Sequence, residues 1–146
     1  MVNVESMMYV STKNYEYDEV SMKIVAEKCQ DYFALTQNLK SSVYSFVPIE
    51  KIVRRMYTGK MYLYSFENCF GETFDLQVLP ECEFVTKRGY VPAPRLNDLD
   101  VVIDKSNLLC KINKRETIEG TFEVINTTIQ YTYNYFCNGI LIKGKI

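Results

Sequence analysis

The N-terminal third of the chain alternates between apolar and polar residues with a helical period. Over Tyr15–Leu39, apolar residues recur every three or four positions and charged residues fill the spaces between them. The members of this apolar stripe are Val20, Ile24, Val25, Tyr32 and Phe33. Such spacing places side chains on one side of an α-helix, so it predicts a long helix, whose start Asn14 or Asp18 can cap.

A second helix is predicted over Pro48–Thr58. Proline suits the first helical position, and Gly59 can adopt the left-handed conformation that closes a helix. The apolar stripe consists of Ile49, Ile52, Val53 and Met56. Glu50 lies in the first turn and Arg54 and Arg55 lie in the last, which is the order that the helix dipole favours.

Beyond residue 59 the period shortens to about two, and β-branched and aromatic residues dominate, which is typical of strands. The predicted strands are Lys60–Phe66, Thr73–Leu79, Cys82–Thr86, Leu99–Ile103, Leu108–Ile112, Thr121–Ile125, Ile129–Phe136 and Ile140–Ile142. Asn68–Gly71 and Asn138–Gly139 predict hairpin turns, because Asn and Gly tolerate positive φ. Gly89–Asn97 contains two prolines and predicts a surface loop.

These elements predict the α+β class, with two N-terminal helices followed by a mostly antiparallel β-sheet or a small β-barrel. The 146 residues have the length of one ordinary domain, and no linker or repeat divides them. We therefore expect residues 1–146 to form a single globular domain.

The composition excludes several kinds of chemistry. The chain contains no histidine, so Ser-His-Asp and Cys-His catalysis and histidine-bound metals are excluded. The five cysteines form no C-x-x-C pair, which indicates free, mostly buried thiols and no zinc site. No glycine-rich phosphate loop is present, and Asp98, Asp100 and Asp104 lack the glycine and terminal glutamate of an EF-hand. We expect neither a cofactor nor a bound metal.

Acid–base catalysis by carboxylates is the remaining enzymatic alternative. The acidic residues of the central region are Glu67, Glu72, Asp75, Glu81 and Glu83. Alternating acids on a strand are more typical of its solvated face, so the sequence favours a protein that is not an enzyme.

Basic and aromatic residues form the best candidate binding site. The first group contains Arg54, Arg55, Tyr57, Lys60, Tyr62 and Tyr64, and the second contains Tyr131, Tyr133 and Tyr135 on one predicted strand. Cations can follow a nucleic-acid backbone while rings stack on bases, although the same tyrosines can pack within a sheet. The net charge of −1 and the pI near 5.6 argue against general DNA binding.

The leading hypothesis is a non-enzymatic protein–protein interaction module, with a viral accessory or assembly protein as one setting suggested by the Tyr-, Lys- and Asn-rich composition. The alternative is a single-stranded nucleic-acid-binding protein. The partner would be another protein or a second copy, paired through an edge strand within Ile140–Ile146. The opening residues do not resemble a secretory signal, so we expect a cytoplasmic or nuclear location, without membrane attachment.

Overall fold

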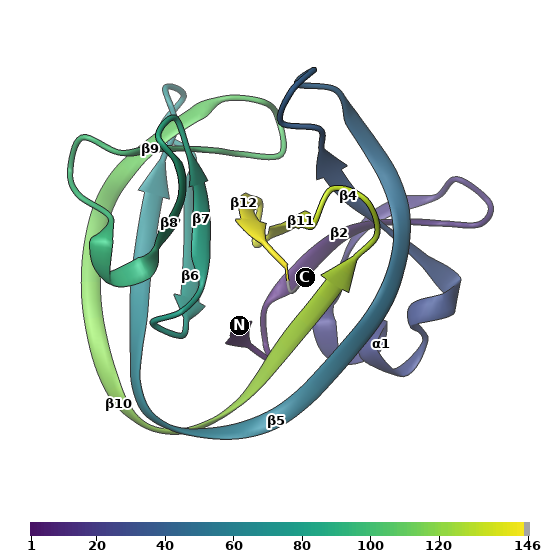
Figure 1. Cartoon of the computed structure of the whole chain (residues 1–146), viewed down its shortest axis with the longest axis horizontal. Helices are drawn as coiled ribbons and strands as arrows, with labels where there is room; N and C mark the ends of the chain where they lie inside the picture. Colours follow the sequence, from purple (N-terminus) through teal and green to yellow (C-terminus); the bar gives the residue numbers. More distant parts are fainter. Residues whose placement is uncertain (145–146) are drawn as a thin grey trace.

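The computed structural model describes residues 1–144 and corrects the predicted fold class (Figure 1). Within that range, the chain is almost entirely β and contains only three short helical segments. The strands are β1 (Val2–Asn3), β2 (Met7–Thr12), β3 (Tyr17–Ser21), β4 (Tyr32–Gln37), β5 (Tyr44–Glu67), β6 (Thr73–Val78), β7 (Glu83–Thr86), β8 (Gly89–Pro92), β9 (Val101–Ile103), β10 (Leu109–Ile129), β11 (Asn134–Cys137) and β12 (Ile140–Lys143). The helical segments are α1 (Met22–Glu27), η1 (Cys29–Asp31) and η2 (Ala93–Arg95).

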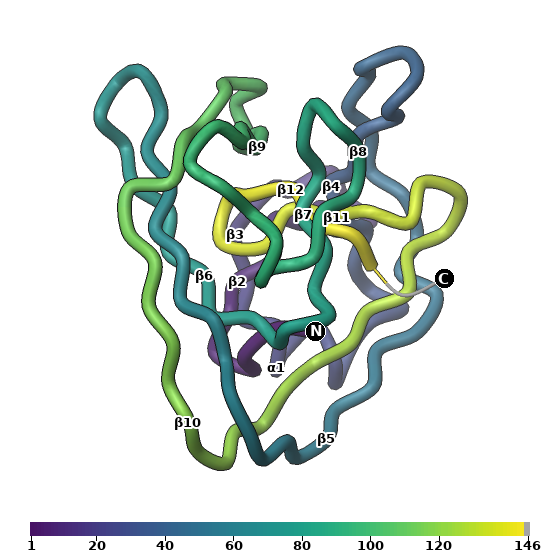
Figure 2. Tube along the Cα trace, turned by 60° about the vertical axis from the view of Figure 1, so that its left-hand side comes forward, coloured from purple at the N-terminus to yellow at the C-terminus, as the bar shows by residue number. Residues whose placement is uncertain are grey.

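Every pair of strands in the described residues is antiparallel, and the strand order interleaves the two halves of the chain. The order is β8-β7-β12-β11-β2-β4-β5-β6-β1-β10-β9, with β3 added to β2 and a further pairing of β5 with β10. The long strands β5 and β10 form a curved ribbon around one side of the molecule, and the shorter strands lie within its curve (Figures 1 and 2). The N-terminal strand and the C-terminal strand both lie inside the sheet order.

The β5–β10 ribbon bends at a pair of facing glycines. Gly59 lies opposite Gly120, and Gly59 has φ of +150°. Tyr57 and Phe122 face each other two register pairs away, and their rings cover these glycines. A Cβ atom at Gly59 would lie 2.7 Å from the Tyr57 hydroxyl. A side chain at either glycine would therefore displace an aromatic ring.

The helix predicted over residues 15–39 is wrong. This segment forms β3, the six-residue α1, η1 and β4. Ser21 caps α1 by accepting a hydrogen bond from the Lys23 amide, but Ile24 is 45% exposed, so the apolar stripe does not form one buried face. Tyr32 and Phe33 instead pair with β2, because distant strands bury them better than one helix face would.

The helix predicted over residues 48–58 is also wrong, because the whole segment lies within β5. Its partner is β10, which places Ile52 opposite Thr127 and Val53 opposite Asn126. The segment is rich in β-branched residues, and a complementary strand more than 60 residues away overrides the local helical spacing. Gly59 marks the bend in a strand rather than the end of a helix.

Most predicted strands beyond residue 59 are confirmed, and so are both hairpin turns. Asn138 and Gly139 have φ of +48° and +85° and connect β11 to β12. Two details differ. The predicted loop at residues 89–97 begins with β8, in which Pro92 pairs at the strand end with Glu83. The predicted strand at residues 129–136 is interrupted by a turn between β10 and β11.

The core contains large aromatic residues and most of the thiols. Tyr64, Phe66 and Phe84 pack against each other with ring centroids 5.4–5.6 Å apart, and the buried Tyr64 hydroxyl donates to the Ala93 carbonyl at 2.6 Å. The prediction of free, mostly buried thiols is confirmed. Cys82, Cys110 and Cys137 are buried, Cys29 is half-buried, and Cys69 is exposed.

Candidate functional site

The two ends of the described chain meet at the same place. The Met1 carbonyl accepts a hydrogen bond from the Leu79 amide at 3.0 Å, and Val2 pairs with both Val78 and Ile125. At the other end, β12 lies between β11 and β7 and leads to Gly144. Sheet pairing between distant segments therefore positions both ends without any local sequence signal.

A cleft of about 240 Å³ lies between these ends. Its lining contains both ends of the described chain, one thiol, two carboxylates, one amide and one amine. The lining residues are Met1, Glu81, Cys82, Glu83, Asn126, Lys143 and Gly144. We call this the terminal cleft. A larger cleft of about 380 Å³ lies on the β6–β5–β10 sheet and is lined largely by polar side chains, but it contains no thiol.

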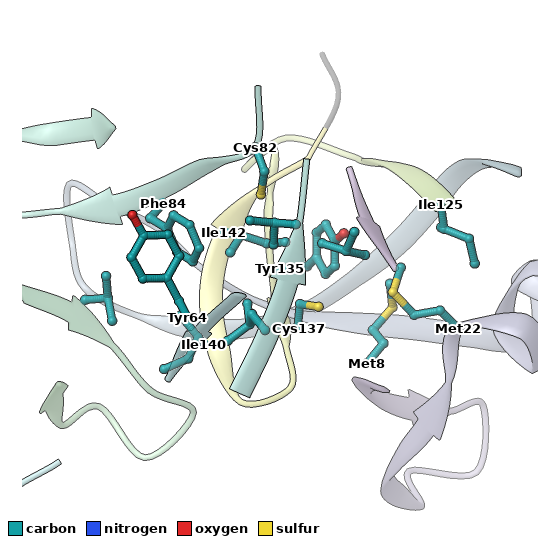
Figure 3. Close-up of a cluster of buried hydrophobic side chains, with 14 of the residues drawn as sticks. Met8, Met22, Tyr64, Cys82, Phe84, Ile125, Tyr135, Cys137, Ile140 and Ile142 are labelled. Carbon is teal, nitrogen blue, oxygen red and sulfur yellow. The ribbon is translucent and has the colours of Figure 1, made fainter. Parts of the chain in front are cut away.

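Cys82 supplies the one thiol of the terminal cleft. Its amide donates to the Leu79 carbonyl at 3.0 Å and its carbonyl accepts from the Ala93 amide at 2.9 Å, so the backbone on both sides is fixed. The side chain belongs to the buried cluster that also contains Tyr135 and Cys137 (Figure 3). Burial raises the pKa of the Cys82 thiol, and the nearby α-amino group of Met1 opposes that rise.

Charged side chains surround the cleft. The Lys143 ammonium lies 3.4 Å from Glu83 and 5.1 Å from the centroid of the Tyr90 ring. Glu81 faces Arg55 at 3.8 Å, and both of these side chains are about half exposed. Opposite charges are therefore balanced at the rim, and ionisable groups are available there for proton transfer.

Gly144 reaches the cleft by a close approach to β10. Its amide donates to the Tyr133 carbonyl at 2.6 Å, and a Cβ atom at this position would lie 2.6 Å from the Thr127 carbonyl oxygen. Only glycine fits there without a backbone shift. The register of β1 on β10 places Val2 opposite Ile125, two residues from Thr127 on the same strand.

The predicted basic–aromatic residues of β5 do not form one platform. Arg54 pairs with Glu123 at 2.6 Å, and Arg55 lies near the terminal cleft. Tyr57 packs over Gly59, the Lys60 side chain is exposed, and Tyr62 is half-buried. Tyr64 is 1% exposed. The ribbon separates their side chains between the core and the surface.

The three C-terminal tyrosines do not share a strand face. Tyr131 and Tyr133 lie in the turn before β11 with φ of +64° and +57°, whereas Tyr135 lies in β11 and is 2% exposed. No observation tests a binding role for either group, so that role stays a prediction.

The sequence analysis named Glu81 and Glu83 as candidate acidic residues but did not single out Cys82 as a nucleophile, since only the fold brings Met1 and Gly144 to this thiol.

The described residues contain no evident metal site or membrane helix. Within residues 1–144, no three Cys, Asp or Glu side chains gather closely enough to hold a metal ion. Over the same range, no helix has the length and apolar character needed to cross a membrane.

Comparison with solved structures relates the fold to known proteins. Over 99% of this chain, it is similar to an intein from a hyperthermophile, with a TM-score of 0.80 at 15% identity and 98% coverage of that structure. The DnaB intein of Synechocystis gives a TM-score of 0.78 at 18% identity and 98% coverage, and an intein-like domain of Clostridium thermocellum gives 0.76 at 15% identity and 99% coverage. No protein-family model and no curated protein matches the sequence.

This likeness overturns the functional hypotheses drawn from the sequence. Inteins are autocatalytic protein-splicing domains, so a non-enzymatic interaction module, a single-stranded nucleic-acid-binding protein and the absence of enzymatic activity are no longer the favoured interpretations. The assignment to a viral setting likewise has no support. The chain has the intein fold, and its chemistry must be argued from its own residues.

Proposed function

We propose that this chain is a self-processing domain that cleaves the peptide bond joining Met1 to a preceding polypeptide. The observation that carries the proposal is the convergence of both chain ends on one cleft that contains the Cys82 thiol. The intein fold supports it, because protein splicing also breaks peptide bonds at the ends of the domain.

Cys82 is the nucleophile in this reaction. Met1 carries a thioether, which has no proton to lose and is a poor acyl acceptor, so the first residue supplies no nucleophile of its own. Met1 and Cys82 line the same cleft, and the α-amino group of Met1 lies near enough to the thiol to lower its pKa. In a precursor, the preceding carbonyl carbon is one bond of about 1.33 Å from that nitrogen, which brings it close to the sulfur.

The reaction proceeds in two steps. The Cys82 sulfur bonds to the carbonyl carbon before Met1, the carbon–nitrogen bond to Met1 breaks, and the thiol proton passes to the departing amine. Water then attacks the thioester, releases the preceding segment as a carboxylic acid and restores the thiol. Glu81, Glu83 and Lys143 are the ionisable groups at the cleft that can relay the proton.

Alkaline pH speeds the first step. Burial holds the pKa of Cys82 above its ordinary value, so the reactive thiolate is a minor species near neutral pH. In a precursor, the Met1 nitrogen is an uncharged amide and no longer opposes that rise. The cleavage rate then increases roughly tenfold per pH unit while the pH remains below the thiol pKa. A reducing compartment, cytoplasmic or nuclear, keeps this thiol free.

The test uses a precursor in which a small folded reporter precedes Met1. The purified precursor is incubated between pH 6 and pH 9, and intact-mass spectrometry follows the release of the 17.1 kDa chain. We expect release that accelerates with pH and with added small thiols, which intercept a thioester. Cys82→Ala should abolish release.

Cys137→Ser is the matched control, since Cys137 is another buried thiol of the same cluster but does not line the cleft. It should cleave at the parental rate. Circular dichroism must show that both variants are folded. Equal cleavage by Cys82→Ala and the parent, or no cleavage by a folded parent at any pH, would refute the proposal.

A further inference from the structure

The thiol of Cys82 and the α-amino group of Met1 form a pair with a second capability. Both residues line the terminal cleft, and the α-amino group lies near enough to the thiol to lower its pKa. The Leu79–Cys82 turn holds them in this relation, because Leu79 donates its amide to the Met1 carbonyl and accepts from the Cys82 amide, each at 3.0 Å. A thiol and an amine fixed side by side can pass an acyl group from one to the other.

We propose that the chain with a free Met1 amino group accepts small acyl groups from external thioesters, first on Cys82 and then on the Met1 nitrogen. This inference uses the same thiol as the proposed processing reaction, but it concerns the reverse direction and a different substrate. The substrate class is a small acyl thioester.

Both steps balance without any further reactant. The Cys82 thiolate attacks the thioester carbonyl, forms a new thioester and releases the donor thiol. The uncharged Met1 amine then attacks the same carbonyl, the carbon–sulfur bond breaks, and an amide forms while Cys82 recovers its proton. The second step is favoured because an amide is more stable than a thioester.

The cleft has room for a small acyl group. Its volume of about 240 Å³ accommodates an acetyl group beside Cys82, given that one water occupies about 30 Å³ in the liquid. Cys82 is only 2% exposed, and Met1 is half-buried against the cluster that contains Leu79.

Proximity sets the expected rate. Groups held at contact distance react with effective concentrations far above those of free solution. We expect acetylation of Met1 to be at least about 100-fold faster in the parent than in Cys82→Ser, since even a small part of that advantage gives such a ratio.

The experiment uses the full chain, released from an N-terminal fusion so that Met1 is retained, as intact mass confirms. S-acetyl-N-acetylcysteamine is added at pH 8, and peptide mapping locates the added acetyl group. We expect one hydroxylamine-resistant acetyl group on the Met1 nitrogen, and loss of the rate advantage at Met1 in Cys82→Ser. Cys137→Ser should react like the parent.

Three results would overturn the inference: acetylation spread over the lysines, acetylation of Lys143 in place of Met1, or Met1 acetylation that does not depend on Cys82. The outcome is separable from that of the processing reaction. A precursor that fails to cleave leaves the acetylation of the free chain measurable, and a free chain that does not react leaves the cleavage result unaffected.

Discussion

Replacement of Asp104 by Asn should destabilise the fold, because the oxygen that accepts from Asn68 and, at 3.7 Å, from the Cys110 thiol becomes a nitrogen donor. The Asp104 side chain is 0% exposed, and its carboxylate accepts from the Ser106 and Leu108 amides at 2.8 and 3.0 Å and from Asn68 Nδ2 at 2.9 Å. Both backbone amides bond to one oxygen, so the amide of Asp104→Asn can keep these contacts. Its nitrogen must then face the nitrogen of Asn68, donor against donor.

The expected cost combines one lost hydrogen bond to a charged acceptor with one unsatisfied buried donor. The free energy of unfolding should fall by about 2–3 kcal/mol, and the melting temperature by about 5–10 °C. Asn68→Asp should reverse the polarity of the pair and restore part of this loss. The restoration is partial, because Asn68 also donates to Glu72 at 3.3 Å and an aspartate would be repelled there.

Urea unfolding followed by far-ultraviolet circular dichroism measures the four members of this double-mutant cycle. Asp98→Asn is the control, since Asp98 is exposed in the same half of the chain, and it should change the unfolding free energy by less than about 0.5 kcal/mol. A loss below that value for Asp104→Asn, or strictly additive effects of the two substitutions, would contradict this account of the pair.

The remaining predictions concern other buried or paired groups. The hydrogen bond from Arg88 lowers the pKa of Asp100 in the folded protein. The ionised carboxylate therefore stabilises the fold above its unfolded-state pKa, and this stabilisation is lost as the pH falls through the lower folded-state pKa. Asp100→Asn should flatten the acid side of a plot of melting temperature against pH. In timed alkylation with mass mapping, exposed Cys69 should react first, while Cys137 stays protected because burial raises its pKa to about 12.

Local signals in the sequence were sufficient to predict the hairpin turns and the strands beside them, because these elements depend on neighbouring residues. Asn138–Gly139 predicts its hairpin because both residues adopt positive φ, and Asn68–Gly71 predicts the β5–β6 turn because the Asn68 side chain accepts from two amides within that turn. The strands beside these turns contain β-branched and aromatic residues, so period and propensity agree.

The N-terminal half could not be predicted in this way. Residues 48–58 have helical spacing, yet their burial and pairing come from β10, which lies more than 60 residues away. The candidate site has the same origin. Cys82 carries no distinguishing motif, and its significance depends on two chain ends that only the completed sheet brings together.

The interleaved strand order has a consequence for the timing of folding. β11 and β12 occupy the middle of the sheet order, and the Asn138 side chain accepts a hydrogen bond from the Met7 amide across 131 residues of sequence. A chain emerging from the ribosome therefore cannot complete its sheet until the last strand has been synthesised. Such distant pairings also slow folding towards the millisecond-to-second range. The terminal cleft consequently assembles at the end of folding, so in the proposed processing reaction a polypeptide before Met1 would have time to fold first.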